Sequence, residues 1–184
     1  MNGIVQGVGF RPFVYRKAVE LNLTGNVLNT STGVEILVNG EEQKVNIFIH
    51  QLQNENPTAS KIKYFKVKNI PDQEFTKFTI KKSTQQLGTT LISPDLAVCE
   101  DCVREMFDEK DKRHLYPFIN CTNCGPRFSI IENTPYDRPA TTMKNFQMCD
   151  YCKDEYKNPL NRRFHAQPIA CPECGPAYSL MTNK

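Results

Sequence analysis

Two cysteine pairs, CEDC at residues 99–102 and CTNC at residues 121–124, decide how the second half of this chain folds. Between the pairs lie 18 residues, and a second set repeats the arrangement with CDYC at residues 149–152 and CPEC at residues 171–174. Adding 50 to each cysteine number of the first set gives the second set. Cysteines separated by two residues in a tight turn can direct both thiolates at one cation, and two such turns complete a tetrahedral shell. The spacing therefore predicts two four-cysteine zinc modules in tandem.

The eight cysteines are expected to bind two structural zinc ions. Disulfide bonds and redox-active dithiols are the alternatives, but redox motifs seldom occur as four evenly placed pairs. We expect each set to share one ion, in preference to ligands interleaved between the sets. A closed four-cysteine shell leaves no open position for a substrate, so the zinc would be structural. The expected ligands are Cys99, Cys102, Cys121 and Cys124 for one ion, and Cys149, Cys152, Cys171 and Cys174 for the other.

The duplication extends beyond the cysteines, because other residues recur at the same interval. A duplicated unit explains this recurrence better than chance does. The glycine after each second cysteine pair suits a turn whose backbone N–H groups point at the thiolates. The recurring pairs are Gly125 and Gly175, Pro126 and Pro176, Glu105 and Glu155, Arg113 and Arg163, and Ser129 and Ser179, with Phe128 matched by Tyr178.

The position of the cysteines divides the chain into two parts. The chain has 184 residues, enough for one or two domains, and every cysteine follows residue 98. Apolar residues in the second part are too scattered for a large core, so metal binding would supply much of its folding energy. We expect a first domain at 1–83, a polar linker at 84–93 and a zinc region at 94–184, with modules at 94–133 and 144–184.

Charge and hydropathy argue against several classes of protein. The formal net charge of +3 is too small to indicate nucleic-acid binding by itself. No apolar run approaches the length of a membrane span, and the N-terminus shows no basic segment followed by an apolar one, so no membrane insertion or secretion is expected. Free thiols in metal-binding spacing suit a reducing cytosol, and we expect a cytoplasmic protein.

The first 82 residues show the periodicities of a compact α+β domain. Residues 33–39 alternate apolar and polar side chains as a half-buried strand does, and residues 45–52 place apolar side chains on one helical stripe. The expected order is βαββαβ, the ferredoxin-like split βαβ arrangement, with the last strand at an edge. The expected elements are a strand near 4–5, a helix from 12 to 21, strands at 25–30 and 33–39, a helix around 45–52, and strands at 61–69 and 74–82.

The segment GIVQGVGFR at residues 3–11 is the second strong signal. Gly7 and Gly9 allow a tight turn whose successive N–H groups can form an anion-binding nest. A helix is expected to begin just after the turn, so its positive end faces the same space. Arg11 adds a planar guanidinium that suits phosphate, although such a turn can also be an ordinary strand-to-helix connection. The predicted phosphate-binding loop, called the glycine loop below, comprises Gln6, Gly7, Val8, Gly9, Phe10 and Arg11.

Asn29 lies 18 residues after Arg11, on or just after the strand expected beside the glycine loop. Its amide oxygen can hold a water molecule, which would make Arg11 and Asn29 the candidate catalytic residues. The alternative is a turn-forming asparagine, which the surrounding serine, threonine and glycine residues permit.

Residues 1–82 resemble the acylphosphatase family. The loop VQGVGFR at residues 5–11 and the segment NTSTG at residues 29–33 match the family's Val-Gln-Gly-Val-x-Phe-Arg and Asn-Thr-x-x-Gly signatures. The resemblance implies that Arg11 binds phosphate and that Asn29 positions the attacking water. This chemistry needs a clamp on the phosphoryl oxygens and an oriented water, and it uses no metal or cofactor.

The whole chain resembles the N-terminal part of the HypF family, the carbamoyltransferases of nickel-iron hydrogenase maturation. The segments YPFINCTNCGPRFS at residues 116–129 and RRFHAQP at residues 162–168 carry this resemblance, together with the cysteine spacing. It implies hydrolysis of carbamoyl phosphate to carbamate and phosphate, within an enzyme that supplies the carbamoyl group for cyanide ligands. It also implies a hydrogenase maturation partner that accepts the carbamoyl group on a C-terminal cysteine.

Members of this family continue past the position of Lys184 into nucleotide-binding and carbamoyl-transfer domains, and they usually have several residues before the equivalent of Gly3. We therefore expect a fragment of a longer protein. One alternative function is a catalytically inactive interaction module, because a shortened first strand would loosen the loop that carries Arg11. Another is a zinc-ribbon nucleic-acid binder, although acidic residues offset the basic ones in the zinc region.

Two histidines and one basic stretch complete the candidate features. His114 and His165 each stand six or seven residues before a cysteine pair, but they do not correspond under the 50-residue shift. Eight cysteines already fill two shells, so a structural or docking role is expected for both histidines. The stretch KDKR at residues 110–113 is interpreted as a solvated surface.

Overall fold

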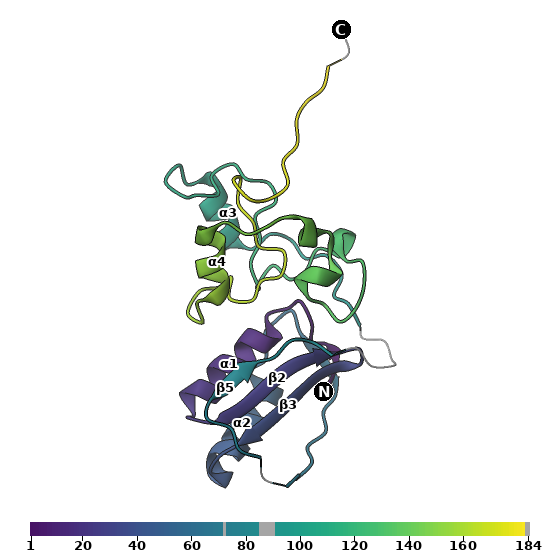
Figure 1. Cartoon of the computed structure of the whole chain (residues 1–184), viewed down its shortest axis with the longest axis vertical. Helices are drawn as coiled ribbons and strands as arrows, with labels where there is room; N and C mark the ends of the chain where they lie inside the picture. The colour runs from purple at the N-terminus through teal and green to yellow at the C-terminus, as the bar shows by residue number, and fades with distance from the viewer. Residues whose placement is uncertain (72, 85–90, 183–184) are drawn as a thin grey trace.

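The computed structural model describes residues 1–71, 73–84 and 91–182. Figure 1 shows a sheet-containing N-terminal unit (residues 1–83) at one end and a cysteine-rich region (residues 94–182) stacked above it. The linker expected at 84–93 lies mostly outside the described residues.

The N-terminal unit has the expected α+β order, including both strands expected after the second helix. Its elements are β1 (Asn2–Ile4), α1 (Phe10–Glu20), β2 (Thr24–Thr30), β3 (Gly33–Asn39), α2 (Glu42–Asn54), β4 (Lys61–Tyr64) and β5 (Phe78–Ile80). The ferredoxin-like prediction is therefore confirmed.

Hydrogen bonds join the five strands into one layer. β2 pairs antiparallel with β3 and parallel with β5, while β1 pairs antiparallel with β4. The amine of Met1 donates to the Val34 carbonyl at 2.8 Å, and the Val34 N–H donates to the Met1 carbonyl at 2.9 Å, so β1 lies beside β3. The resulting order is β4-β1-β3-β2-β5, with the last strand at an edge as expected.

β4 and β5 are shorter than the strands expected at 61–69 and 74–82. β4 ends at Tyr64 because its partner β1 has only three residues, and a strand extends only as far as a neighbour supplies backbone groups. β5 pairs with Gly25–Val27 of β2 over three residues, although β2 continues to Thr30, and beyond β5 an isolated bridge joins Thr84 to Thr30.

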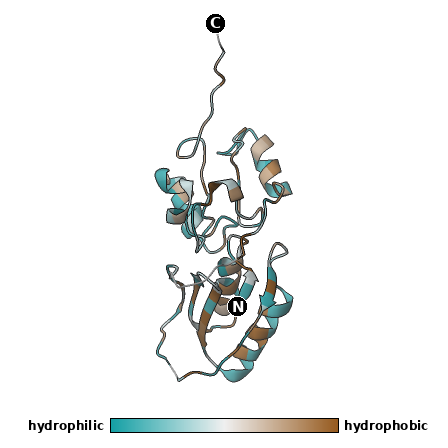
Figure 2. Cartoon of the chain, turned by 90° about the vertical axis from the view of Figure 1, so that its right-hand side faces the viewer, coloured by the Kyte–Doolittle hydropathy of each residue, from teal (hydrophilic) through white to brown (hydrophobic). Residues whose placement is uncertain are grey.

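The two helices pack against the sheet around one apolar core (Figure 2). The expected stripe of α2 is buried where Phe48 and Leu52 meet the sheet, with exposed fractions of 1% and 3%. Phe48 and Phe78 pack edge to face, which fixes α2 against β5. This core holds the N-terminal end of α1, and with it the glycine loop, in place.

The cysteine-rich region repeats one local structure at the 50-residue interval. Its helices, α3 (Glu100–Phe107) and α4 (Asp150–Lys157), each begin directly after the first cysteine of a set. Leu115 and His165 occupy equivalent positions and adopt the same left-handed conformation, with φ of 55° and 54°. Short 3₁₀ turns at Phe128–Ile130, Arg138–Ala140 and Thr142–Asn145 connect the two modules.

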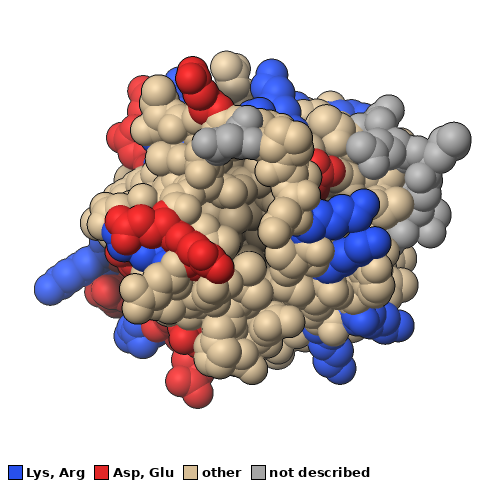
Figure 3. Space-filling view, turned by 90° about the horizontal axis from the view of Figure 1, so that it is seen from below, with Lys and Arg blue, Asp and Glu red and all other residues tan. Residues whose placement is uncertain are grey.

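The surface of the described residues carries both signs of charge. Seen from below, the end of the molecule has basic side chains mostly on one side and acidic side chains mostly on the other (Figure 3). Among the described residues, the longest helix is too short and too polar to cross a membrane.

Candidate active site and metal centres

The glycine loop forms a turn with unpaired backbone donors. Gly7 and Gly9 have φ of 74° and 75°, a conformation that side chains disfavour, and Gly9 is the residue before α1. Within the described residues, no protein group accepts a hydrogen bond from the backbone N–H groups of residues 7–11. The first turn of α1 also contains no acidic residue. The loop therefore presents several donors and the positive end of a helix to an anion.

Arg11 is nearly buried, at 7% exposed, and one of its terminal nitrogens is tethered to the cysteine-rich region. Its Nη2 donates to the Asp137 carboxylate at 2.6 Å and to the Tyr136 carbonyl at 3.2 Å. Among the described residues, Nε and Nη1 of Arg11 have no hydrogen-bond partner. These two donors are the part of the guanidinium that could hold phosphoryl oxygens.

Asn29 lies on β2 and is fully buried. Its Nδ2 donates to the Tyr136 carbonyl at 3.2 Å, the same oxygen that accepts from Arg11. Its Oδ1 has no hydrogen-bond partner among the described residues. A buried amide oxygen without a partner is costly, so this atom is suited to accept a hydrogen bond from a water molecule.

Gln6 fastens the glycine loop to both parts of the chain. Its Nε2 donates to the carbonyls of Thr30 and Gly33, each at 2.8 Å, at the turn between β2 and β3. Its Oε1 accepts a hydrogen bond of 2.8 Å from the Tyr136 N–H. The loop, β2 and the segment around Tyr136 therefore share one polar network.

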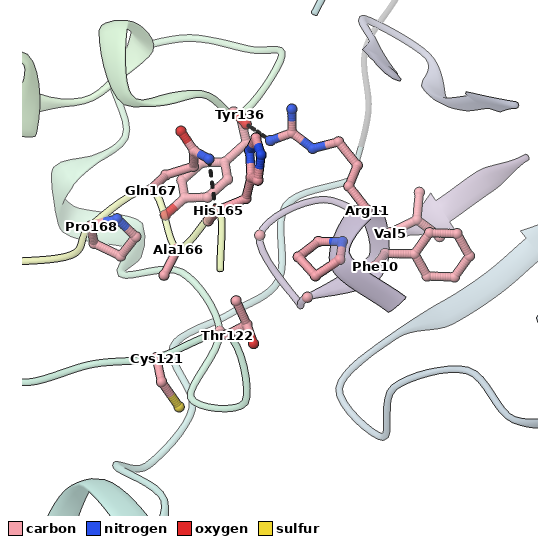
Figure 4. A pocket seen from close by; sticks show the side chains of 14 residues that line it. Val5, Phe10, Arg11, Cys121, Thr122, Tyr136, His165, Ala166, Gln167 and Pro168 are labelled. Carbon is pink, nitrogen blue, oxygen red and sulfur yellow. Dashed lines mark hydrogen bonds between the residues drawn. The ribbon is translucent and has the colours of Figure 1, made fainter. Parts of the chain in front are cut away.

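The cysteine-rich region covers the glycine loop at close range. A Cβ on Gly7 would lie 3.0 Å from Pro126, and one on Gly9 would lie 3.1 Å from Thr122, so side chains at these glycines would be crowded. A small pocket lies between the two parts, and Figure 4 shows Arg11 reaching from α1 towards Tyr136, with His165 and Gln167 beside it.

His165 faces this pocket and is not part of a cysteine cluster. Its ring packs against the rings of Phe164 and Tyr156, with centroids 4.7 and 5.0 Å away. Burial, followed by the nearby positive charge of Arg11, lowers the pKa of His165 to about 4. The imidazole therefore stays neutral near neutral pH.

This lowered pKa predicts a pH-dependent stability difference between the wild type and His165→Asn. The unfolded chain binds a proton at the ordinary pKa of 6.5 and the folded chain only at about 4, so acid favours unfolding within this window. We expect the wild type to lose about 2 kcal/mol more than the variant between pH 7 and 5. Asparagine tolerates the left-handed backbone at this position without titrating.

Urea unfolding of the zinc-loaded proteins across that pH range measures the difference. Comparing the two proteins cancels the titration of the cysteines, which they share. A stability difference that stays constant from pH 7 to 5 would show that the histidine titrates normally.

The structure brings the eight cysteines together as two clusters of four. One contains Cys99, Cys102, Cys121 and Cys124, the other Cys149, Cys152, Cys171 and Cys174, and all eight are free thiols. Neighbouring sulfur atoms lie 3.6–3.8 Å apart in both clusters. A tetrahedral zinc ion with bonds of about 2.3 Å to sulfur has sulfur–sulfur edges of about 3.8 Å, so both clusters fit zinc.

Each cluster also receives an arginine from the opposite module. Arg113 of the first module donates from Nη2 to Cys152 Sγ at 3.3 Å, and Arg162 of the second donates from Nη1 to Cys102 Sγ at 3.0 Å. Four thiolates around one zinc ion carry a net negative charge, which these guanidinium groups would balance. The two clusters are therefore linked through their surroundings.

Between the clusters lies a buried ion-pair network built from residues that recur in the repeat. Arg113 pairs with Glu155 at 2.5 Å, and Arg163 pairs with both Glu155 and Glu105. Arg113 and Arg163 are 0% and 2% exposed. The interpretation of residues 110–113 as a solvated surface is thus wrong for Arg113, because its ionic partner comes from the other module.

Sequence reasoning missed Tyr136 and Asp137. They lie between the two modules, where the 50-residue repeat gives no matching residue, and they contact Arg11 across more than 120 positions of sequence. Because these partners are so far apart in the sequence, no local pattern indicates their contact.

Comparisons with known proteins agree with this arrangement. The family model described as acylphosphatase matches residues 1–80, and the HypF finger model matches residues 98–131 and 148–181. An acylphosphatase from Caldivirga maquilingensis is 42% identical over 84 residues, which cover 44% of this chain and 87% of that protein.

Longer relatives match most of the chain. The carbamoyltransferase HypF of Synechocystis sp. is 49% identical over 147 residues, covering 80% of this chain and 19% of that protein. A crystal structure described as full-length HypF in the phosphate- and nucleotide-bound form superposes with a TM-score of 0.93 at 53% identity, covering 96% of this chain and 23% of that one. This chain thus spans about a fifth of the length of these relatives. It belongs to the HypF family and corresponds to the N-terminal part of those carbamoyltransferases, an acylphosphatase domain followed by two HypF fingers.

Proposed function

We propose that residues 1–83 form a domain that hydrolyses an acyl phosphate, with carbamoyl phosphate as substrate and carbamate and phosphate as products. The observation that carries this proposal is the placement of Arg11 and Asn29 beside each other, since both donate to the Tyr136 carbonyl. The unpaired N–H groups of residues 7–11 supply the rest of an anion site. Membership of the HypF family supports carbamoyl phosphate as the acyl phosphate.

The reaction would need orientation and charge stabilisation more than covalent participation by the protein. The free nitrogens of Arg11 and the N–H groups of the glycine loop would hold the phosphoryl oxygens, whose negative charge they stabilise. Asn29 Oδ1 would accept a hydrogen bond from the attacking water. The water oxygen would bond to phosphorus as the bond from phosphorus to the acyl oxygen breaks, and the carbamate would leave with that bonding pair. This scheme uses no metal or cofactor.

The two cysteine clusters would hold zinc in a structural role, because all four positions of each tetrahedron are filled by protein. In the longer protein, we propose that carbamate passes to a nucleotide-dependent domain and that the carbamoyl group reaches a hydrogenase maturation partner. The clustered thiols also suit a cytoplasmic protein.

A nucleic-acid-binding role has less support from the arrangement of charges. Arg113 and Arg163, which could have formed part of a basic face, are buried in ion pairs with glutamates.

Arg11→Ala and Asn29→Ala are expected to slow the hydrolysis of carbamoyl phosphate by about 100-fold or more each, because the first removes a donor aimed at the transition state and the second removes the acceptor that orients the attacking water. The measurement is phosphate release by the purified chain. Arg16→Ala and Asn54→Ala serve as matched controls, because Arg16 lies on the same helix and Asn54 is exposed. Zinc content, measured on the same samples, reports folding. Unchanged rates in both zinc-loaded site variants would contradict the proposed site.

A further inference from the structure

We propose that the Tyr136–Asp137 segment, between the two zinc modules, is a positioning element of the acyl-phosphate site; this inference rests on the function proposed above. Asp137 and the Tyr136 carbonyl would fix the guanidinium of Arg11 so that Nε and Nη1 point at the substrate anion. The cysteine-rich region would then complete the active site as well as stabilise the fold.

The contacts of this segment reach every polar side chain of the candidate site. The Tyr136 carbonyl accepts from Arg11 and Asn29, each at 3.2 Å, and the Tyr136 N–H donates to Gln6 at 2.8 Å. One peptide segment therefore ties together the anion-binding arginine, the candidate water-binding asparagine and the glutamine that holds the loop. A backbone carbonyl that serves two side chains fixes their separation in a way that neither could achieve alone.

The geometry favours a positioning role for Asp137 over competition with the substrate. Asp137 uses Oδ1 to accept from Arg11 Nη2, while Oδ2 accepts from the Ser83 hydroxyl. The carboxylate is thus held from two sides and occupies one terminal nitrogen of the guanidinium. An anion that took the substrate's place would be expected to bind the fork of the guanidinium and the N–H groups of the glycine loop, and Asp137 does neither.

The cysteine-rich region anchors this segment firmly. The Arg138 side chain donates to the carbonyls of Gln167, Ile169 and Phe146 at 2.7–2.9 Å, and its N–H donates to the Gln167 side chain at 2.8 Å. These bonds hold Asp137 at a defined distance from the second module. Positioning of Arg11 would therefore depend on a folded zinc region.

The test is the affinity for inorganic phosphate, measured by calorimetry on the zinc-loaded 184-residue chain at fixed ionic strength. If Asp137 positions Arg11, Asp137→Ala should weaken phosphate binding by about tenfold, because the guanidinium loses its orientation. Asp137→Asn should stay within about threefold of the wild type, since its amide oxygen can still accept from Nη2. If Asp137 acted only through its charge, both variants would instead bind phosphate more tightly, because each removes a negative charge beside an anion site.

Two further variants make the outcome decisive. Glu132→Ala removes a carboxylate from the same inter-module stretch, where it pairs with Lys144 at the surface, and should leave phosphate affinity unchanged. Arg11→Ala should abolish binding. If Arg11→Ala binds phosphate like the wild type, or if the wild type does not bind it, the proposed function fails together with the positioning role. If Arg11→Ala loses binding while Asp137→Ala binds as well as the wild type or tighter, only the positioning role fails.

Turnover gives a second readout on the same proteins. A misoriented Arg11 should lower kcat of Asp137→Ala more than it raises KM, and Asp137→Asn should restore most of the rate. A carboxylate that merely competed with substrate would show the reverse, a lower KM at unchanged kcat in both variants.

Discussion

Cys102→Ser is expected to release zinc from both clusters and to unfold the cysteine-rich region as one unit. Structural zinc contributes about 10–16 kcal/mol of folding free energy in isolated zinc-finger peptides, far more than a small apolar core supplies. Cys102 is fully buried, and its sulfur also accepts from Arg162 of the second module. Loss of the first centre would therefore disturb the residues that surround the second.

Zinc stoichiometry separates coupled modules from independent ones. We expect well under one zinc ion per chain in Cys102→Ser and in its counterpart Cys152→Ser. If the modules were independent, each variant would retain one zinc ion per chain, in its intact module. Val103→Ser, next to Cys102 on the same helix and 38% exposed, is the matched control and should keep two ions. One tightly bound ion in either cysteine variant would argue against coupling.

Arg163→Met should lower the free energy of unfolding of the zinc-loaded chain by about 3–5 kcal/mol, the usual cost of leaving a buried charge without its partner. Arg163 holds two carboxylates, those of Glu105 and Glu155, and also donates to the Asn120 carbonyl at 3.0 Å. Burial alone would raise the pKa of Glu105, and hydrogen bonds from Arg163 and Arg162 bring it below its ordinary value. Without Arg163, Glu105 keeps Arg162 as an ionic partner, and Glu155 keeps Arg113 together with a long hydrogen bond of 3.5 Å from Asn161.

Urea unfolding compares this variant with Arg104→Met, which removes an exposed arginine that pairs with Asp101 at the surface. Exposed pairs contribute little, so that control should change stability by less than about 1 kcal/mol. Similar losses in both variants would mean that the buried network has no special role. Arg113→Met, the counterpart in the repeat, should behave like Arg163→Met.

Local patterns account for what could be predicted from the sequence. The glycine loop and the start of α1 depend on residues within one turn of each other, and the stripe of α2 depends on the helical period. The two clusters follow from cysteine spacing, and the 50-residue repeat also singled out Glu105, Arg113 and their counterparts. Their role stayed hidden because each arginine pairs with a glutamate of the other module.

Contacts between distant segments account for what could not be predicted. Arg11 and Asp137 are 126 residues apart, and nothing near either residue indicates the other. The early end of β4 is a similar case, since residues beyond Tyr64 favour a strand but lack a neighbour to pair with. In both cases the outcome depends on which segments meet in space, which a periodic pattern does not record.

The tether from Asp137 to Arg11 also bears on when the protein becomes active during its synthesis. Domains generally fold from the N-terminus as they leave the ribosome, so the N-terminal unit can form before Asp137 has been made. At that stage the arginine lacks the carboxylate that would orient it. Acyl-phosphate hydrolysis would begin only after the second module had been translated and had bound its metal. In a nascent chain, the proposed hydrolysis would thus not precede the folding of the cysteine-rich region.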